Sequence, residues 1–201
     1  MRNLKFLDFG NNILDNIPDI LETFPAVVEL GLLNNSIRDF GDTAFAGATK
    51  LDSLNLNSNI LHGLPAAVSQ IPSLKQLFLT NNSISDIDKD VMHNLTKVQN
   101  LFLDVNKISQ IADDTFALTT QLQWLDLRYN NLTSLPLLIM NLKNLTKLCL
   151  DENPIECSCS AMKKLKSWDT SNMILILILD GICSDGKILI QDNIQKVLPK
   201  C

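Results

Sequence analysis

Aromatic and charged side chains alternate with leucines in one short segment, LQWLDLRYNNL, which runs from Leu122 to Leu132. Strict alternation predicts a β-strand with one buried face, so Trp124, Asp126 and Arg128 share the opposite face. Rings beside an arginine and carboxylates can bind a partner through ring contacts, ion pairs and hydrogen bonds, and they are typical of protein-binding hot spots. The chemistry offered here is therefore non-covalent recognition.

Sequence signatures of catalytic sites are missing from the chain. It contains no G-x-S-x-G, P-loop or H-E-x-x-H motif. Its two histidines, His62 and His93, fall on return segments apart from Cys149. We therefore expect a protein that is not an enzyme and that needs no cofactor.

Three aspartates, Asp104, Asp126 and Asp151, are candidates for holding a calcium ion, because Ca²⁺ prefers carboxylate oxygens. Arg128 sits among them, and its positive charge argues against a cation at the same place. We expect no metal at this site.

The cysteines are concentrated near the C-terminus: Cys157, Cys159, Cys183 and Cys201, with Cys149 just before them. An even cluster predicts disulfides in an oxidising compartment, and metal ligands or free thiols elsewhere. Zinc is the less favoured alternative, because structural zinc usually has two close ligand pairs and Cys183 is far from Cys201. Disulfides would place the chain outside the cell.

The bulk composition describes a foldable, acidic chain. Of its 201 residues, 46% are hydrophobic and 19% are charged, so it can bury a core. The net charge of −5 argues against binding nucleic acid or an anionic membrane through general electrostatics. The longest apolar run, Met173 to Leu179, is too short to span a bilayer.

One motif recurs at a nearly fixed period. Seven segments, from LKFLDFGNN to LTKLCLDEN, end 23 or 24 residues apart, at Asn12, Asn35, Asn59, Asn82, Asn106, Asn130 and Asn153. Each unit offers a short strand, a turn and a return path, and one unit cannot bury its leucines alone. The units should therefore stack into an α/β solenoid with a parallel sheet on one side. Leu125, Leu127 and Leu132, with their equivalents, should point inward.

The asparagine column should also point inward. A buried amide is costly unless it is paired, but its C=O and NH2 groups can bond to the backbone of neighbouring turns. We therefore expect Asn106→Leu to destabilise the fold although leucine is more apolar.

The return segments are of two kinds. The 24-residue units place a buried-type side chain on the convex side, which is Phe45, Phe116 and either Val91 or Met92. The 23-residue units carry Leu-Pro or Ile-Pro instead. We interpret both as packing variants and assign them no function.

The pattern L-x-x-L-x-L-x-x-N-x-L over residues 4 to about 155 resembles the leucine-rich repeat family. The resemblance implies a horseshoe with a concave parallel sheet and an irregular convex side, here as seven repeats over 1–153.

Residues 154–201 resemble the cysteine-rich C-terminal cap of extracellular members of this family. Asn-Pro, C-x-C and an apolar helical face of Met162, Leu165 and Trp168 carry that resemblance. It implies a disulfide-bonded cap with the pairs Cys157–Cys183 and Cys159–Cys201. The spacing is most similar to that of the variable lymphocyte receptors, although no cysteine-bearing N-terminal cap precedes Leu4.

Five N-x-S/T sequons would be N-glycosylation acceptors in a secreted or cell-surface protein, at Asn34, Asn81, Asn94, Asn131 and Asn144.

Alternate strand positions should line the concave face. Phe78 and Phe102 are then neighbours, Trp124 is one strand further on, and Asp104, Arg128 and Asp151 form an alternating-charge row. The ligand-binding set that we expect, in repeats four to six, is Phe78, Phe102, Asp104, Trp124, Asp126, Arg128, Tyr129, Lys147 and Asp151. Repeats one to three should contribute less to ligand binding. The alternative is that the rings only stabilise the sheet and the charges form a solvated row.

Cys149 projects onto this same face. It could be free, covered by the cap, or paired with a second chain.

The function that we expect is extracellular recognition of a protein or glycan on the concave face. The family resemblance implies an immune receptor for antigens or microbial surface molecules. One alternative is an adhesion or guidance ectodomain that binds another cell-surface receptor. Another is a solenoid that forms a homodimer through the N-terminal turn, where Phe6, Leu7 and Phe9 would be exposed, or through Cys149.

Overall fold

The structure, a computed structural model, describes residues 3–17, 21–134 and 141–156. The expected cap, with the pairs Cys157–Cys183 and Cys159–Cys201, lies outside the described residues.

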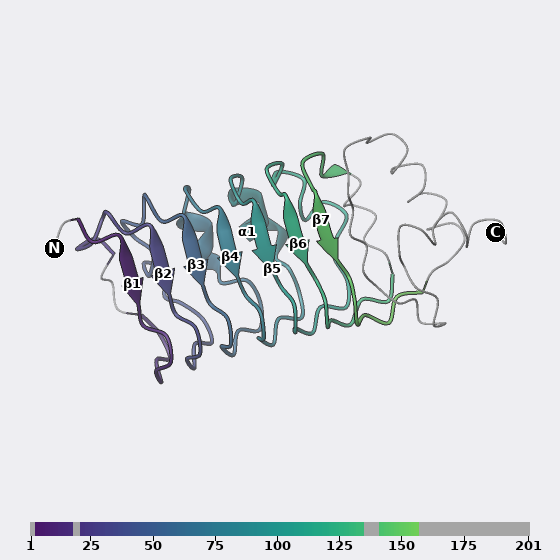
Figure 1. The fold of residues 1–201 in the computed structure, drawn as a ribbon, viewed down its shortest axis with the longest axis horizontal. Helices are drawn as coiled ribbons and strands as arrows, with labels where there is room; N and C mark the ends of the chain where they lie inside the picture. The colour runs from purple at the N-terminus through teal and green to yellow at the C-terminus, as the bar shows by residue number, and fades with distance from the viewer. Residues whose placement is uncertain (1–2, 18–20, 135–140, 157–201) are drawn as a thin grey trace.

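Seven short strands form one parallel sheet, in which the spatial order of the strands is their order along the chain (Figure 1). The strands are β1 (Phe6–Asp8), β2 (Glu29–Gly31), β3 (Ser53–Asn55), β4 (Gln76–Phe78), β5 (Asn100–Phe102), β6 (Trp124–Asp126) and β7 (Lys147–Cys149). Each pairs in register with the next, so that equivalent repeat positions form straight rows across the sheet. The solenoid expected from the repeat is confirmed.

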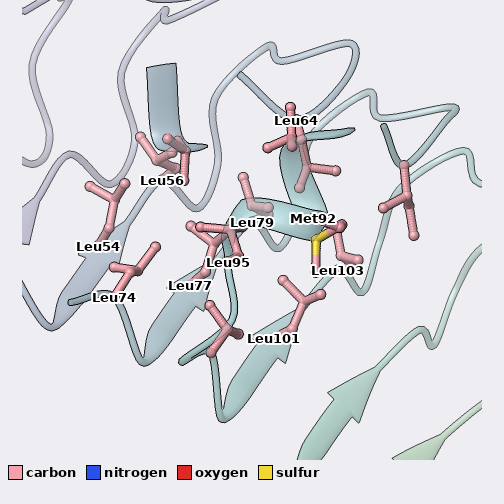
Figure 2. Packing of buried hydrophobic residues seen from close by; sticks show 14 of the residues in the cluster. Leu54, Leu56, Leu64, Leu74, Leu77, Leu79, Met92, Leu95, Leu101 and Leu103 are labelled. Carbon is pink, nitrogen blue, oxygen red and sulfur yellow. The ribbon is translucent and has the colours of Figure 1, made fainter. Parts of the chain in front are cut away.

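The middle residue of every strand is a leucine, and from β2 onward it is buried. Leu54, Leu77, Leu101 and Leu125 are fully excluded from solvent, and so are the leucines two residues later in the same repeats. Figure 2 shows how Leu77, Leu79, Leu101 and Leu103 point into the interior shared by neighbouring turns. Burial of these leucines, at about 25 cal/mol per Å² of apolar surface, is the main force that stacks the turns.

The convex side is less regular, and only two of its described segments are helical. A 3₁₀ helix, η1 (Ala66–Gln70), buries Ala67 and Val68, and an α-helix, α1 (Lys89–Asn94), buries Val91 and Met92. Both candidates for the apolar position of that repeat are therefore buried. In the other 24-residue units, Phe45 and Phe116 are buried as expected. Within the described residues no helix has the length and apolarity needed to cross a bilayer.

The asparagine column joins consecutive turns through hydrogen bonds, as expected. Asn106 is typical: its Oδ1 accepts the Ile84 N–H at 3.0 Å, and its Nδ2 donates to the carbonyls of Leu79 and Leu103, each at 3.0 Å. Asn59, Asn130 and Asn153 repeat this arrangement. The amides thus satisfy backbone groups that the turns leave unpaired.

The residue before each column asparagine has a left-handed backbone, with φ between 52° and 59°. This conformation turns the chain out of the sheet three residues after each strand ends. Asparagine tolerates it at three of the seven positions, Asn11, Asn34 and Asn81. The fold thus repeats one backbone turn and leaves alternate strand side chains standing on an open concave face.

Candidate functional site

Three aromatic rings lie in contact across β4, β5 and β6 on the concave face. Phe78 and Phe102 are register partners, and their rings stack with centroids 4.8 Å apart and planes within 4° of each other. Trp124 meets Phe102 edge-on, with centroids 4.7 Å apart and an interplanar angle of 70°. None of the three belongs to the hydrophobic core cluster, and each is half-buried. The rings therefore form a row on the surface of the sheet.

Lys147 extends this row onto β7. It is the register partner of Trp124, and its Nζ lies 3.6 Å from the centroid of the Trp124 ring. A cation over an indole face is held by a cation–π attraction of about 0.5–1 kcal/mol at an exposed site. One face of Trp124 is therefore covered by an ammonium group of the chain itself.

Arg128, two residues after β6, pairs with Asp126 at the end of that strand. Its Nη2 donates to Asp126 Oδ2 at 2.6 Å and its Nε to Oδ1 at 2.9 Å. The Asp126 side chain is 1% exposed, whereas the Arg128 side chain is 41% exposed. Hydrogen bonding to Asp126 raises the pKa of the Arg128 guanidinium above its ordinary value. The arginine thus neutralises a buried carboxylate and still presents part of its guanidinium to solvent.

This pair adds Asp126 to the alternating-charge row expected from the sequence, in which the charge of Asp104 also raises the pKa of Arg128. The ion-pair partner of Arg128 lies two residues back, at the end of β6, and Asp104 accepts a hydrogen bond from Thr80 Oγ1 at 2.7 Å. Residues i and i+2 share a face of a strand, so alternation contained the signal for this pair. Asp151 and the 55% exposed Tyr129 lie at the edge of the site.

Cys149 lies beside Asp126 in the register and carries a free thiol. It is 4% exposed but stands outside the hydrophobic core cluster. Burial raises the pKa of the Cys149 thiol, and the negative charge of Asp126 raises it further. The buried Trp124 Nε1 has no regular hydrogen-bond partner among the described residues, and its weak interaction with this thiol lowers the same pKa slightly. A disulfide with a second chain would require this part of the site to open.

We call the residues of these contacts the aromatic–charged patch: Phe78, Phe102, Asp104, Trp124, Asp126, Arg128 and Lys147. The structure brings all of them together on β4–β7 and the turns that follow these strands. The three aspartates weighed as calcium ligands do not form a metal-binding group, and neither does any other set of three or more His, Cys, Asp or Glu in the described part of the chain.

A hollow of about 360 Å³ opens over β1–β4, where the sequence predicted a smaller contribution to ligand binding. Phe6 and Phe78 are among the residues that line it, together with the carboxylates of Asp8 and Glu29. Sequence reasoning missed it because each of its residues is unremarkable alone. The sequence feature that indicates the hollow is Gly31, because it places a residue without a side chain between Asp8 and Asn55 in the register.

The five sequon asparagines, Asn34, Asn81, Asn94, Asn131 and Asn144, are all exposed. Their exposure is compatible with glycosylation, which stays a prediction.

Comparisons with known proteins identify the repeat. The sequence model described as "Leucine rich repeat" matches residues 25–84, 49–108 and 96–155, which include β2–β7. Among solved structures, the chain is similar to an internalin C2 from Listeria monocytogenes str. 4b F2365, with a TM-score of 0.67 and 26% sequence identity. The similarity covers 87% of this chain and 70% of that chain.

Proposed function

The chain belongs to the leucine-rich repeat family, whose members generally mediate binding to proteins or other ligands. We propose that its concave face binds a protein through the aromatic–charged patch. A solenoid of this family is typically a scaffold for binding without catalysis. The single observation that carries the proposal is the unbroken row of contacts from Phe78 to Lys147 on the open face of a parallel sheet. Parallel sheets are normally covered on both faces, so this face is available to a partner.

The patch is ordered before any partner arrives. Ring contacts hold Phe102 and Trp124, and the carboxylate of Asp126 holds Arg128. Immobilising a free side chain at an interface costs about 0.5–1.5 kcal/mol, and much of that cost is already met here. Trp and Arg are also the residue types that most often dominate binding energy.

A protein partner fits the patch better than a glycan. Phe78 and Phe102 cover each other, and Lys147 covers one face of Trp124. A sugar ring needs an open aromatic face to lie on, whereas protein side chains can insert between ring edges and polar groups. Phe78 keeps one face free toward the hollow over β1–β4, but Phe102 is stacked on Phe78 and contacts Trp124, so the centre of the patch favours a protein.

The double variant Phe102→Ala/Trp124→Ala tests this function. Screened on arrays of purified surface proteins and of glycans, the wild-type chain should bind a protein, and the double variant should bind it at least about 30-fold more weakly, since a hot-spot residue contributes about 2 kcal/mol or more. Leu118→Ala is the matched control, because Leu118 is an exposed apolar residue on the return segment after β5. Unchanged binding by a folded double variant, or a glycan as the only hit, would contradict the proposal.

We also propose that this binding takes place outside the cell, in a recognition role like that of the variable lymphocyte receptors. The cysteine spacing of 154–201 and the exposed sequons support this part. An adhesion or guidance receptor would use the same face, and the identity of the array hit separates the two roles. Peptide mapping of the secreted chain should recover Cys157–Cys183 and Cys159–Cys201, and four free thiols there would contradict the location.

A further inference from the structure

The hollow over β1–β4 is made by a missing side chain. Gly31 stands in the register row between Asp8 on β1 and Asn55 on β3, and Phe78 follows on β4. The row above it runs from Phe6 through Glu29 to Ser53. The resulting space of about 360 Å³ is at the small end of ligand sites, which suits one side chain rather than a larger molecule.

The Asp8 carboxylate is fixed in the floor of this hollow. Its Oδ1 accepts the Gly10 N–H at 2.8 Å. A Cβ added at Gly31 would lie 2.5 Å from the same oxygen, so the carboxylate leans across β2 into the space that glycine leaves. Glycine at this position therefore both opens the hollow and admits the charge.

The lining is acidic and contains no basic residue. Asp8 and Glu29 bring two carboxylates, and neither takes part in the ion pairs recorded for the described residues. Within the part of the chain that the structure describes, no ion pair therefore neutralises the negative charge of the hollow.

An open aromatic face borders the same space. One face of the Phe78 ring is covered by Phe102 on β5, so the opposite face is directed toward β3 and the hollow, which Phe78 lines. Phe6, 56% exposed, stands at the other end. Ring faces and carboxylates together are the elements that attract an organic cation.

We propose that this hollow is the subsite for an arginine side chain of the protein partner. The inference rests on the proposed function, since it names the group that the N-terminal half of the same face receives. A planar guanidinium can stack on the Phe78 face while it donates hydrogen bonds to a carboxylate, which an ammonium cannot do. A basic group also complements a chain of net charge −5.

The direct test is an NMR titration of the full ¹⁵N-labelled chain with N-acetyl-arginine methylamide. Gly31, Leu33 and Asn55 line the hollow, and their amide signals should shift in a saturable way with a dissociation constant on the order of millimolar, as expected for contacts by one exposed side chain. The matched citrulline compound is an uncharged analogue of the same length. Equal shifts with citrulline, or shifts that map elsewhere, would overturn the inference.

Variants that remove one negative charge show which carboxylates bind the arginine compound. Glu29→Gln should weaken arginine binding by about 2- to 5-fold, because a surface ion pair contributes up to about 1 kcal/mol, which corresponds to about 5-fold. Glu22→Gln is the matched control, since Glu22 is exposed on the return segment between β1 and β2 and does not line the hollow. Equal weakening by both variants would mean a general charge effect and would overturn the subsite. Gly31→Ala, which displaces the Asp8 carboxylate, should also weaken binding in a folded chain.

The outcome is separable from that of the proposed function. Partner binding that survives Phe102→Ala/Trp124→Ala overturns the patch but leaves the arginine titration as it stands. A titration without saturable shifts overturns the arginine subsite and leaves the patch untouched.

Discussion

Single residues show where this repeat accepts strain. Val105 occupies the left-handed turn position after β5, with φ 56°, although a β-branched side chain is disfavoured there. It is 42% exposed, so no burial compensates the strain. Its N–H donates to the Arg128 carbonyl at 2.9 Å, and this bond belongs to the ladder that holds the turn in place. The strain is therefore stored next to the aromatic–charged patch.

Val105→Asn should stabilise the chain by about 1 kcal/mol, because asparagine tolerates the left-handed region and valine does not. Urea denaturation monitored by circular dichroism measures the change. Lys107→Gln, also exposed in this turn but without a positive φ, should change stability little. An unchanged or lowered midpoint for the asparagine variant would show that Val105 is not strained.

Cys149 gives a pH dependence with a definite sign. Burial raises the pKa of its thiol, so the folded chain holds this proton more tightly than the unfolded chain does. The contribution to stability is complete below the ordinary thiol pKa of 9.0 and is lost as the pH rises through the folded value. Above about pH 9, the chain should therefore lose stability relative to Cys149→Ala. Parallel stability profiles for the two proteins would contradict this.

At the scale of elements, the period of the sequence determined most of the fold. The leucine rows and the asparagine column repeat every 23 or 24 residues, so a register between strands followed from the sequence positions alone. The same alternation predicted which residues line the concave face. It did not predict their pairing, because how far Lys147 or Arg128 reaches depends on rotamers and on neighbouring side chains. The hollow at Gly31 escaped prediction for another reason: it comes from a missing side chain, and each residue around it is unremarkable alone.

Asn106→Leu should destabilise the chain by about 1–3 kcal/mol, since it leaves the buried Ile84 N–H without its acceptor and an unsatisfied buried group costs about 1–3 kcal/mol. The carbonyls of Leu79 and Leu103 each lose one donor but keep another, because the side-chain amides of Asn82 and Asn130 still donate to them. Asn131→Leu, at an exposed neighbouring position, is the matched control. Equal midpoints in urea for the two variants would show that the column does not join the turns.

At the scale of the whole molecule, the concave face has two parts with different chemistry. The β4–β7 part carries the aromatic–charged patch, in which one ion pair and one cation–π contact already satisfy the charges. The β1–β4 part carries a hollow whose carboxylates have no such partner among the described residues. Phe78 belongs to both parts. A partner that lies along the solenoid would meet rings at one end and an acidic hollow at the other.

The location of the partner is the central claim, and hydroxyl-radical footprinting of the complex tests it most directly. Oxidation of Phe78, Phe102, Trp124 and Tyr129 should fall when the array-selected protein is bound. Ile13 and Leu118, exposed apolar residues outside the patch, should be oxidised at the same rate with and without it. Protection of Leu118, with unchanged oxidation of the four aromatic residues, would place the partner elsewhere and contradict the account.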